Sequence, residues 1–161
     1  MKPSKRSRRA VAVGLAATGV VAAAAPAAQA NPGPYGCKWQ NRTAIKIWVD
    51  TSTLPSGYGT LAMYAAGAWN RSTYMQITGA SSSLDANIVL QGGALGGNAL
   101  GSTAQGSYDA ATGFCTGQAR STIDNNKITA WYGTSALSAA QAAVSHEIGH
   151  AIGLWHDDTL S

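Results

Sequence analysis

The chain has 161 residues, is 45% hydrophobic and 11% charged, and carries a formal net charge of +4. Five of its eleven basic residues fall within residues 2–9, whereas residues 31–161 contain six Lys and Arg against seven Asp and Glu, a net charge of −1. This charge excludes a basic nucleic-acid-binding surface, and the length suits one domain with a sizeable core.

Residues 1–30 have the pattern of a secretory signal peptide. The basic residues 2–9 precede an apolar run at 10–25, and a small-x-small cleavage site ends at Ala30. The alternative, a membrane-spanning helix, is disfavoured because the run is too short and too rich in alanine. We therefore expect a secreted, extracellular protein that begins at Asn31 and has no membrane association after cleavage. A pair of arginines in the basic segment leaves the Sec and Tat export routes both open.

Cys37 and Cys115 are the only cysteines of the chain. In the oxidising environment outside the cell they are expected to form a disulfide. This bond would close a loop of nearly eighty residues, for which chain entropy gives roughly 4–5 kcal/mol of stabilisation. The alternative is that the Cys37 thiolate blocks a metal site in a latent form. It is disfavoured because only thirteen residues, 31–43, separate the cleavage site from the first predicted strand, too few for an inhibitory prodomain.

The first part of the mature chain contains both strand-like and helix-like patterns. Residues 44–50 alternate apolar and polar side chains and predict a strand. Residues 60–70 repeat apolar side chains at helical spacing and predict a helix. Two more short strands are predicted at 75–77 and 86–91.

Residues 92–126 are rich in Gly, Ser, Ala, Thr and Asn. An interdomain linker is one interpretation, but Tyr108, Phe114 and Cys115 lie within this stretch and would be tied to the core. We therefore expect a functional loop region that carries one or two edge strands. Residues 127–132, KITAWY, predict another strand.

A final helix is predicted from Ser138 onward. Ser138 and Gln141 match a capping box, in which the serine accepts from the first turn and the glutamine reaches back. Gly153 lies where a residue in the left-handed conformation would end the helix. The order of strands and helices predicts a single α+β or α/β domain in three layers.

The three histidines of the chain all lie within HEIGHAIGLWHD, residues 146–157. His146 and His150 are one helical turn apart on the same face, so both imidazoles can bind one metal ion. Gly153 permits a sharp turn after the helix, which lets His156 supply a third nitrogen. Three neutral nitrogens with one open position are typical of a catalytic zinc site, whereas a structural zinc site would need a fourth protein ligand.

Glu147 follows the first histidine and is expected to reach a water on the open side of the metal. Zinc lowers the pKa of such a water to about 7, and a carboxylate beside it can take the proton. The resulting hydroxide would attack a carbonyl that the same zinc polarises, and delivery of the proton through Glu147 to the leaving amine would complete peptide-bond hydrolysis, with Glu147 as general base. The alternative is a disulfide-closed domain with incidental surface histidines, which leaves the five fixed positions of the motif unexplained.

At this motif, HExxHxxGxxH, the sequence resembles the metzincin zinc metalloproteases. The matching positions are His146, Glu147, His150, Gly153 and His156. The compact plan is most similar to the small secreted matrixin-like proteases of bacteria, although Asp157 after the third histidine is a feature of the adamalysin branch. The resemblance implies a metzincin-like (zincin) α+β domain at 31–161. Its twisted, mixed five-stranded sheet would pack with two long helices, the second of which carries the zinc motif.

The resemblance also implies one catalytic Zn²⁺, protein or peptide substrates, and a substrate bound as an added strand along an edge of the sheet. The Gly-rich stretch at 98–104 is the candidate for that edge strand. We expect a monomer. The sequence is compatible with bound calcium but does not indicate it, because it shows no clustered acidic loop of the EF-hand type.

The methionines depart from the metzincin pattern. Metzincins have a methionine-containing turn after the third histidine, and here the methionines are Met1, Met63 and Met75. We therefore expect either a fragment that lacks most of the C-terminal subdomain or a truncated homologue. The corresponding alternative function is that of a degenerate, non-catalytic protein that binds zinc or peptides.

Overall fold

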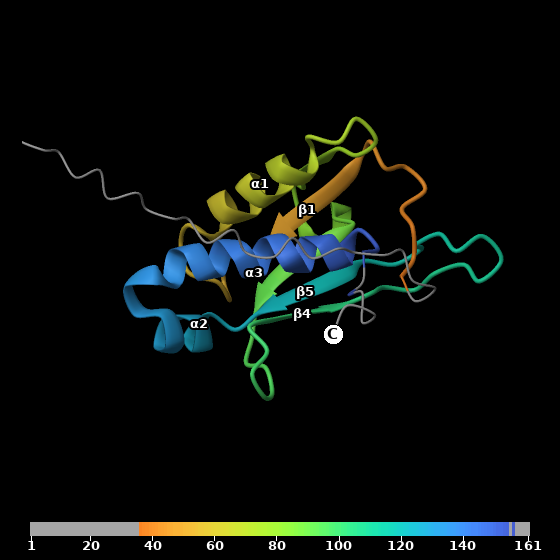
Figure 1. Ribbon diagram of the computed structural model, residues 1–161. Coiled ribbons are helices and arrows are strands. Elements are labelled where there is room, and N and C mark those ends of the chain that lie inside the picture. The colour runs from red at the N-terminus through yellow and green to blue at the C-terminus, as the bar shows by residue number, and fades with distance from the viewer. Residues whose placement is uncertain (1–35, 155, 157–161) are drawn as a thin grey trace, which may run out of the picture.

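A computed structural model describes residues 36–154 and residue 156 of the protein (Figure 1). The predicted signal peptide, the predicted mature start at Asn31 and the adamalysin-like Asp157 lie outside these residues. Every helix in the described part of the chain lacks the length and apolar character needed to cross a bilayer.

Five strands form one mixed sheet, as predicted. In spatial order they are β2 (Ile77–Gly79), β1 (Ile45–Val49), β3 (Ile88–Gly92), β5 (Ala119–Ile123) and β4 (Gly101–Ala104). The first four run parallel, and β4 pairs antiparallel with β5 at one edge. The edge strand expected within 98–104 is therefore confirmed, and the stretch 92–126 contains two strands, of which β5 is internal.

Two long helices, α1 (Tyr58–Trp69) and α3 (Ala136–Ala151), pack side by side on one face of this sheet (Figure 1). The shorter helix α2 (Asn125–Tyr132) precedes α3 and packs against it, and two 3-10 turns are present at η1 (Ser83–Asp85) and η2 (Gly133–Ser135). Because both long helices cover the same face, the domain has two layers. The coarse α+β class is confirmed, but the expected three-layer arrangement is wrong.

The core lies between the sheet and the two long helices. Alternation along each strand directs every second side chain toward the helices. Burying an aliphatic side chain of this kind contributes roughly 1.5–3 kcal/mol. The largest fully buried side chains of this core are Ile45, Ile77, Ile88, Leu90, Ile123, Ile128, Val144 and Ile148.

Residues 127–132 are helical, so the strand predicted there is wrong. Asp124 caps the N-terminus of α2, because its carboxylate accepts a hydrogen bond from the backbone N–H of Lys127 at 3.0 Å. Ile128 is then fully buried, and Gly133 ends the helix with a φ of 49°. A cap and one buried side chain thus override the strand propensity of the Ile, Thr, Trp and Tyr residues.

Helix α3 begins at Ala136, so the capping box predicted at Ser138 is not formed. The turn η2 leads directly from α2 into α3, and the N-cap residue Ser135 makes no side-chain cap hydrogen bond. Ser138 is instead an exposed residue of the first turn. The predicted helix end is confirmed, with Gly153 at a φ of 100° directly after the C-cap residue Ile152.

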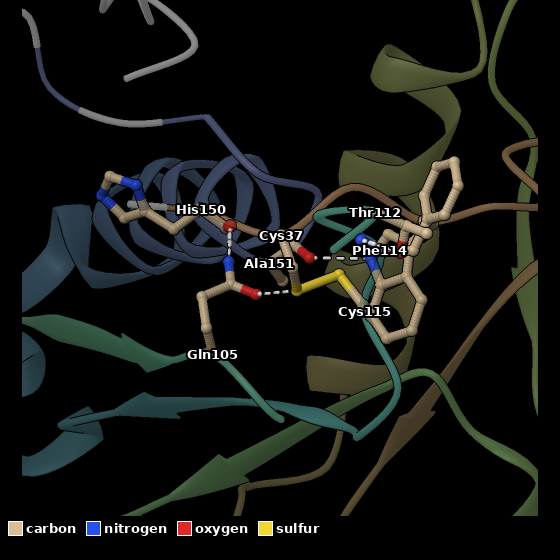
Figure 2. The surroundings of a disulfide bond; sticks show 8 residues. Cys37, Gln105, Thr112, Phe114, Cys115, His150 and Ala151 are labelled. Atoms are coloured by element: carbon tan, nitrogen blue, oxygen red, sulfur yellow. Dashed lines mark hydrogen bonds between the residues drawn. A yellow bond between two sulfur atoms is a disulfide. The ribbon is translucent and has the colours of Figure 1, made fainter. Parts of the chain in front are cut away.

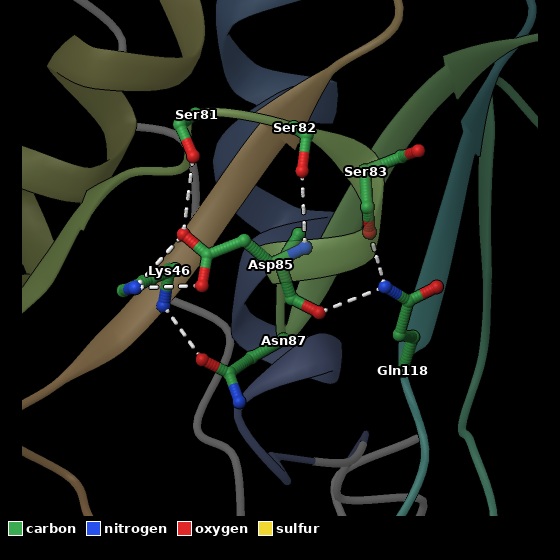
Figure 3. A network of polar contacts seen from close by, with 8 residues as sticks. Lys46, Ser81, Ser82, Ser83, Asp85, Asn87 and Gln118 are labelled. Carbon is green, nitrogen blue, oxygen red and sulfur yellow. Dashed lines mark hydrogen bonds and ion pairs between the residues drawn. The ribbon is translucent and has the colours of Figure 1, made fainter.

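A polar network fixes the turn η1 against the sheet (Figure 3). Lys46 Nζ lies 2.8 Å from both carboxylate oxygens of Asp85, and the backbone N–H of Lys46 donates to Asn87 Oδ1 at 2.8 Å. Gln118 Nε2 donates to the carbonyl oxygen of Ser83. The network joins β1, β3 and β5 near their first residues, so it helps to set the register of these parallel strands.

The loop between β3 and β4 is anchored by the ammonium group of Lys127. Its Nζ donates to the carbonyl oxygens of Leu95, Gly97 and Ala99 at 2.8, 3.0 and 3.0 Å. It also lies 3.4 Å from Asp124 Oδ2, and the lysine side chain is only 14% exposed. An internal ammonium therefore holds the loop that leads into the edge strand.

Lys127→Met is expected to lower the free energy of unfolding by about 1–3 kcal/mol, because three carbonyls and one carboxylate lose their charged partner. Methionine keeps much of the apolar stem and removes the ammonium. Urea denaturation measures the change. Lys38→Met, at an exposed lysine, is the control and should shift the free energy by less than about 0.5 kcal/mol. Equal effects of the two substitutions would show that the contacts of the Lys127 ammonium with the three carbonyl oxygens add no stability.

Candidate metal centre

His146 and His150 lie one turn apart near the C-terminal end of α3, and their Nε2 atoms are 3.0 Å apart. Val144, Ile148 and Ala151 of the same helix are fully buried. These three side chains fix the rotation of the helix about its axis, and this rotation leaves His146 exposed and His150 half-buried on one side.

A sharp turn at Gly153 brings the chain back toward the two imidazoles. The N–H of Gly153 donates to the carbonyl of His150 at 2.9 Å, and the N–H of Leu154 donates to that of Gly149 at 3.0 Å, the pattern of a Schellman motif. A Cβ on Gly153 would lie 2.7 Å from the carbonyl oxygen of Cys37. Glycine is therefore needed here both for the positive φ and for the close approach of Cys37.

His156 completes the group of three predicted ligands. Its Nε2 lies 2.9 Å from that of His146 and 3.0 Å from that of His150. In a tetrahedral site with metal–nitrogen bonds of about 2.0–2.1 Å, ligand nitrogens are about 3.3 Å apart. The three rings therefore need to separate by only about 0.3 Å to bind one ion, and this group could hold a metal.

A hydrogen bond to the backbone determines the tautomer of His150, and therefore which ring nitrogen has a lone pair available for a metal. Its Nδ1 lies 2.6 Å from the carbonyl oxygen of Leu154, and only a protonated Nδ1 can donate to that oxygen. In the neutral ring Nε2 then carries the lone pair. A backbone acceptor behind the ring is the usual device that fixes the tautomer of a metal-binding histidine.

Metal binding is expected to weaken as the pH falls, because protons compete with the ion for imidazole nitrogens. His146 is exposed by surface area, but the atoms packed around its ring partly desolvate it. This desolvation, and then the neighbouring His150 and His156, disfavour the charged ring and hold the pKa of His146 below its usual value of 6.5. His146 therefore stays neutral to a lower pH than a free histidine. Between about pH 7 and about pH 5 we expect the apparent Kd for zinc to rise about 10-fold or more, measured by competition with a chromophoric chelator. A constant Kd over this range would contradict imidazole ligation.

Glu147 is buried between α3 and the edge strand, with only 4% of its surface exposed. Thr103 Oγ1 donates a hydrogen bond to Glu147 Oε2 at 2.7 Å. Burial raises the pKa of this carboxyl above the usual 4.5, and the hydrogen bond from Thr103 opposes the shift. A buried carboxyl with a raised pKa beside three converging imidazoles has the properties of a general base.

Two cavities adjoin Glu147 and the histidines, and the larger of them is lined by His146 and His156 but not by His150. One, of about 320 Å³, is bordered by the edge-strand residues Gly101, Ser102 and Thr103. The other, of about 550 Å³, is lined mainly by apolar groups that include Leu100 and Ala143. Both volumes fall in the range of ligand-binding sites.

The predicted disulfide between Cys37 and Cys115 is formed, with a sequence separation of 78 residues. It lies next to the end of α3, and Gln105 is placed between the disulfide and His150 (Figure 2). Gln105 Nε2 donates to the carbonyl of His150, and its Oε1 lies 3.4 Å from Cys37 Sγ. Together with the contact between Cys37 and Gly153, these interactions tie the start of the domain to the turn that follows α3.

Two residues of this site, Thr103 and Gln105, were not predicted from the sequence. Thr103 contacts Glu147, and Gln105 contacts the C-terminal end of α3. Both belong to the edge strand or its continuation, which was located within 98–104 without roles for its side chains. The sequence feature that could have indicated the role of Thr103 is its position two residues after Gly101, because residues two apart on a strand lie on the same face.

Comparison with known proteins adds no assignment. The chain matches no protein-family model, and no curated protein matches it significantly. The functional interpretation therefore depends on the geometry of the three histidines, Glu147 and the adjoining cavities.

Proposed function

We propose that the protein is a secreted zinc-dependent endopeptidase. The observation that supports this most directly is the convergence of three imidazole Nε2 atoms, 2.9–3.0 Å apart, beside the buried carboxyl of Glu147. Secretion is supported by the signal-like sequence at 1–30 and by the disulfide between Cys37 and Cys115.

Zinc fits this set of ligands. Imidazole nitrogens suit zinc, and their spacing suits the tetrahedral geometry that zinc adopts. Three protein ligands leave one position for water or substrate, which is the arrangement of catalytic rather than structural zinc sites. When bound, the ion would polarise a carbonyl group and lower the pKa of a water.

In this proposal Glu147 carries the proton. Its carboxylate takes a proton from the attacking water and later delivers it to the nitrogen of the departing peptide. The raised pKa of Glu147 suits both steps, because a general base is most effective when its pKa approaches the working pH.

Proteins or peptides in an extended conformation are the proposed substrates. Strand β4 lies at the edge of the sheet, so one side of its backbone can pair with an added strand. The apolar cavity beside His146 can receive a side chain of such a segment. Main-chain pairing would provide affinity, and the cavity would select among side chains.

Removal and restoration of zinc test the proposal. Dialysis of the full chain against a chelator is expected to abolish casein hydrolysis, and about one zinc ion per chain should restore it. His150→Ala should lose both bound zinc and activity. Gln141→Ala, at an exposed position of the same helix, is the control and should lose neither.

The outcomes separate three kinds of protein. Chelator-sensitive hydrolysis supports the endopeptidase. Stoichiometric zinc without hydrolysis would indicate a metal-dependent binding protein instead. A chain that retains no zinc after dialysis would leave the histidines incidental and the disulfide-closed domain as the remaining interpretation.

A further inference from the structure

The carboxyl group of Glu147 lies against Gly101 and Thr103 of the edge strand, and Thr103 is hydrogen-bonded to Ser121 behind it. We call these three small residues the carboxylate seat. Gly101 and Thr103 are two residues apart on β4 and therefore share a face, and both are less exposed than their neighbours on that strand. Thr103 is paired across the sheet with Ser121 of β5. Helix α3 packs on β4 and β5 and brings Glu147 onto this seat.

Two hydroxyl groups, those of Ser121 and Thr103, are hydrogen-bonded in series to the Glu147 carboxylate. Thr103 Oγ1 lies 2.7 Å from Glu147 Oε2 and 3.1 Å from the Glu147 carbonyl oxygen. A hydroxyl has one proton, and the shorter contact, with the charged oxygen, takes it. Ser121 Oγ lies 2.8 Å from Thr103 Oγ1 and 3.4 Å from the Glu147 carbonyl oxygen, so its one proton goes to Thr103, the nearer acceptor. Ser121 is fully buried, and hydrogen bonds shielded from water in this way are strong.

Gly101 provides the space for the other carboxylate oxygen. A Cβ on Gly101 would overlap Glu147 Oε1 and would lie 2.6 Å from Glu147 Cγ. The backbone of Gly101 does not have a positive φ, so the site uses the missing side chain and not the conformational freedom of glycine. With Oε2 bonded to Thr103 and Oε1 above Gly101, the plane of the carboxylate is fixed.

We propose that Thr103 is a positioning residue that orients the Glu147 carboxylate for proton transfer, with Gly101 and Ser121 as its supports. The inference rests on the proposed endopeptidase function. Because Thr103 holds Oε2, Oε1 is the oxygen that accepts the proton of the attacking water. A carboxylate that is already oriented does not have to reorganise during the reaction, and this lowers the barrier.

Substitutions in the full-length, zinc-loaded protein test the role of Thr103. Thr103→Val removes only the hydroxyl and is expected to lower kcat about 10- to 100-fold with KM within about 2-fold and zinc content unchanged. Thr103→Ser restores the donor and should return kcat to within about 3-fold of the parent. Thr122→Val is the matched control, because Thr122 lies on the opposite face of β5 and contacts Gln91.

Gly101→Ala tests the contact between Gly101 and Glu147 Oε1, the oxygen that Thr103 does not hold. The added methyl displaces Oε1 and is expected to lower kcat about 10-fold or more with zinc retained. This variant and Thr103→Ser keep the inference testable if Thr103→Val does not fold. Activity of Gly101→Ala equal to that of the parent would contradict the seat.

Failure of the inference and failure of the proposed function have different signatures. An active, zinc-dependent parent whose Thr103→Val variant keeps full kcat would overturn the positioning role and leave the endopeptidase intact. Loss of zinc in parallel with activity would show that Thr103 only supports the fold, which also overturns the role. A parent without zinc-dependent hydrolysis would overturn the function and the inference together.

Discussion

Glu147→Ala is expected to lower kcat for peptide hydrolysis by about 10³-fold, because the attacking water loses the group that takes its proton. The three imidazoles are untouched by this change, so about one zinc ion per chain should remain bound. KM should change little, since Glu147 acts on the water and not on the substrate backbone. Hydrolysis of a fluorogenic peptide and metal analysis of the same sample measure both quantities.

Ser138→Ala is the control for this experiment. Ser138 is exposed on the same helix, away from the histidines, and forms no helix cap, so its replacement should leave zinc content and kcat unchanged. A Glu147→Ala variant that binds zinc and retains full activity would rule out Glu147 as the general base. Loss of zinc in this variant would instead indicate that the carboxyl supports the metal site.

Replacement of Cys37 and Cys115 by alanine is expected to lower the free energy of unfolding by roughly 4–5 kcal/mol, since the cross-link closes a long loop in the unfolded chain. The loss should also weaken zinc binding. The Cys37 peptide contacts Gly153, and Gln105 bridges from the disulfide to the end of α3, so the turn after α3 loses part of its support. Urea denaturation of the zinc-free protein and a zinc titration measure the two effects.

Reduction of the parent protein provides the control, because it removes the same bond without changing the sequence. The reduced parent and the double variant should unfold at similar urea concentrations. A decrease in the free energy of unfolding of less than about 1 kcal/mol would contradict this estimate. It would mean that the unfolded chain without the disulfide keeps residual structure, so that the cross-link removes little conformational entropy. Unchanged zinc affinity would show that the turn holds His156 without help from the cross-link.

The local patterns of the sequence were sufficient for most of the elements. The strand at 44–50, the helix at 60–70 and the helix that ends before Gly153 were predicted within a few residues, because each has its own periodicity or terminating residue. The segment at 127–132 was predicted as a strand and is a helix. Its outcome depends on the Asp124 cap and on burial of Ile128 under the rest of the domain, and strand propensity contains neither.

The sequence alone determined the chemistry of the candidate site. The spacing of His146, His150 and His156 around Gly153 specified that three imidazoles could meet, since helical pitch and the freedom of glycine are local properties. The disulfide followed in the same way from the presence of two cysteines in a chain expected to be exported.

Only the tertiary structure decided what surrounds that chemistry. Thr103 and Gly101 reach Glu147 across 44 and 46 positions of the chain, and Gln105 reaches His150 across 45. These contacts exist because β4 is the antiparallel edge strand beneath α3. Strand order and helix placement are set by the packing of the whole core, and no local pattern of residues records them.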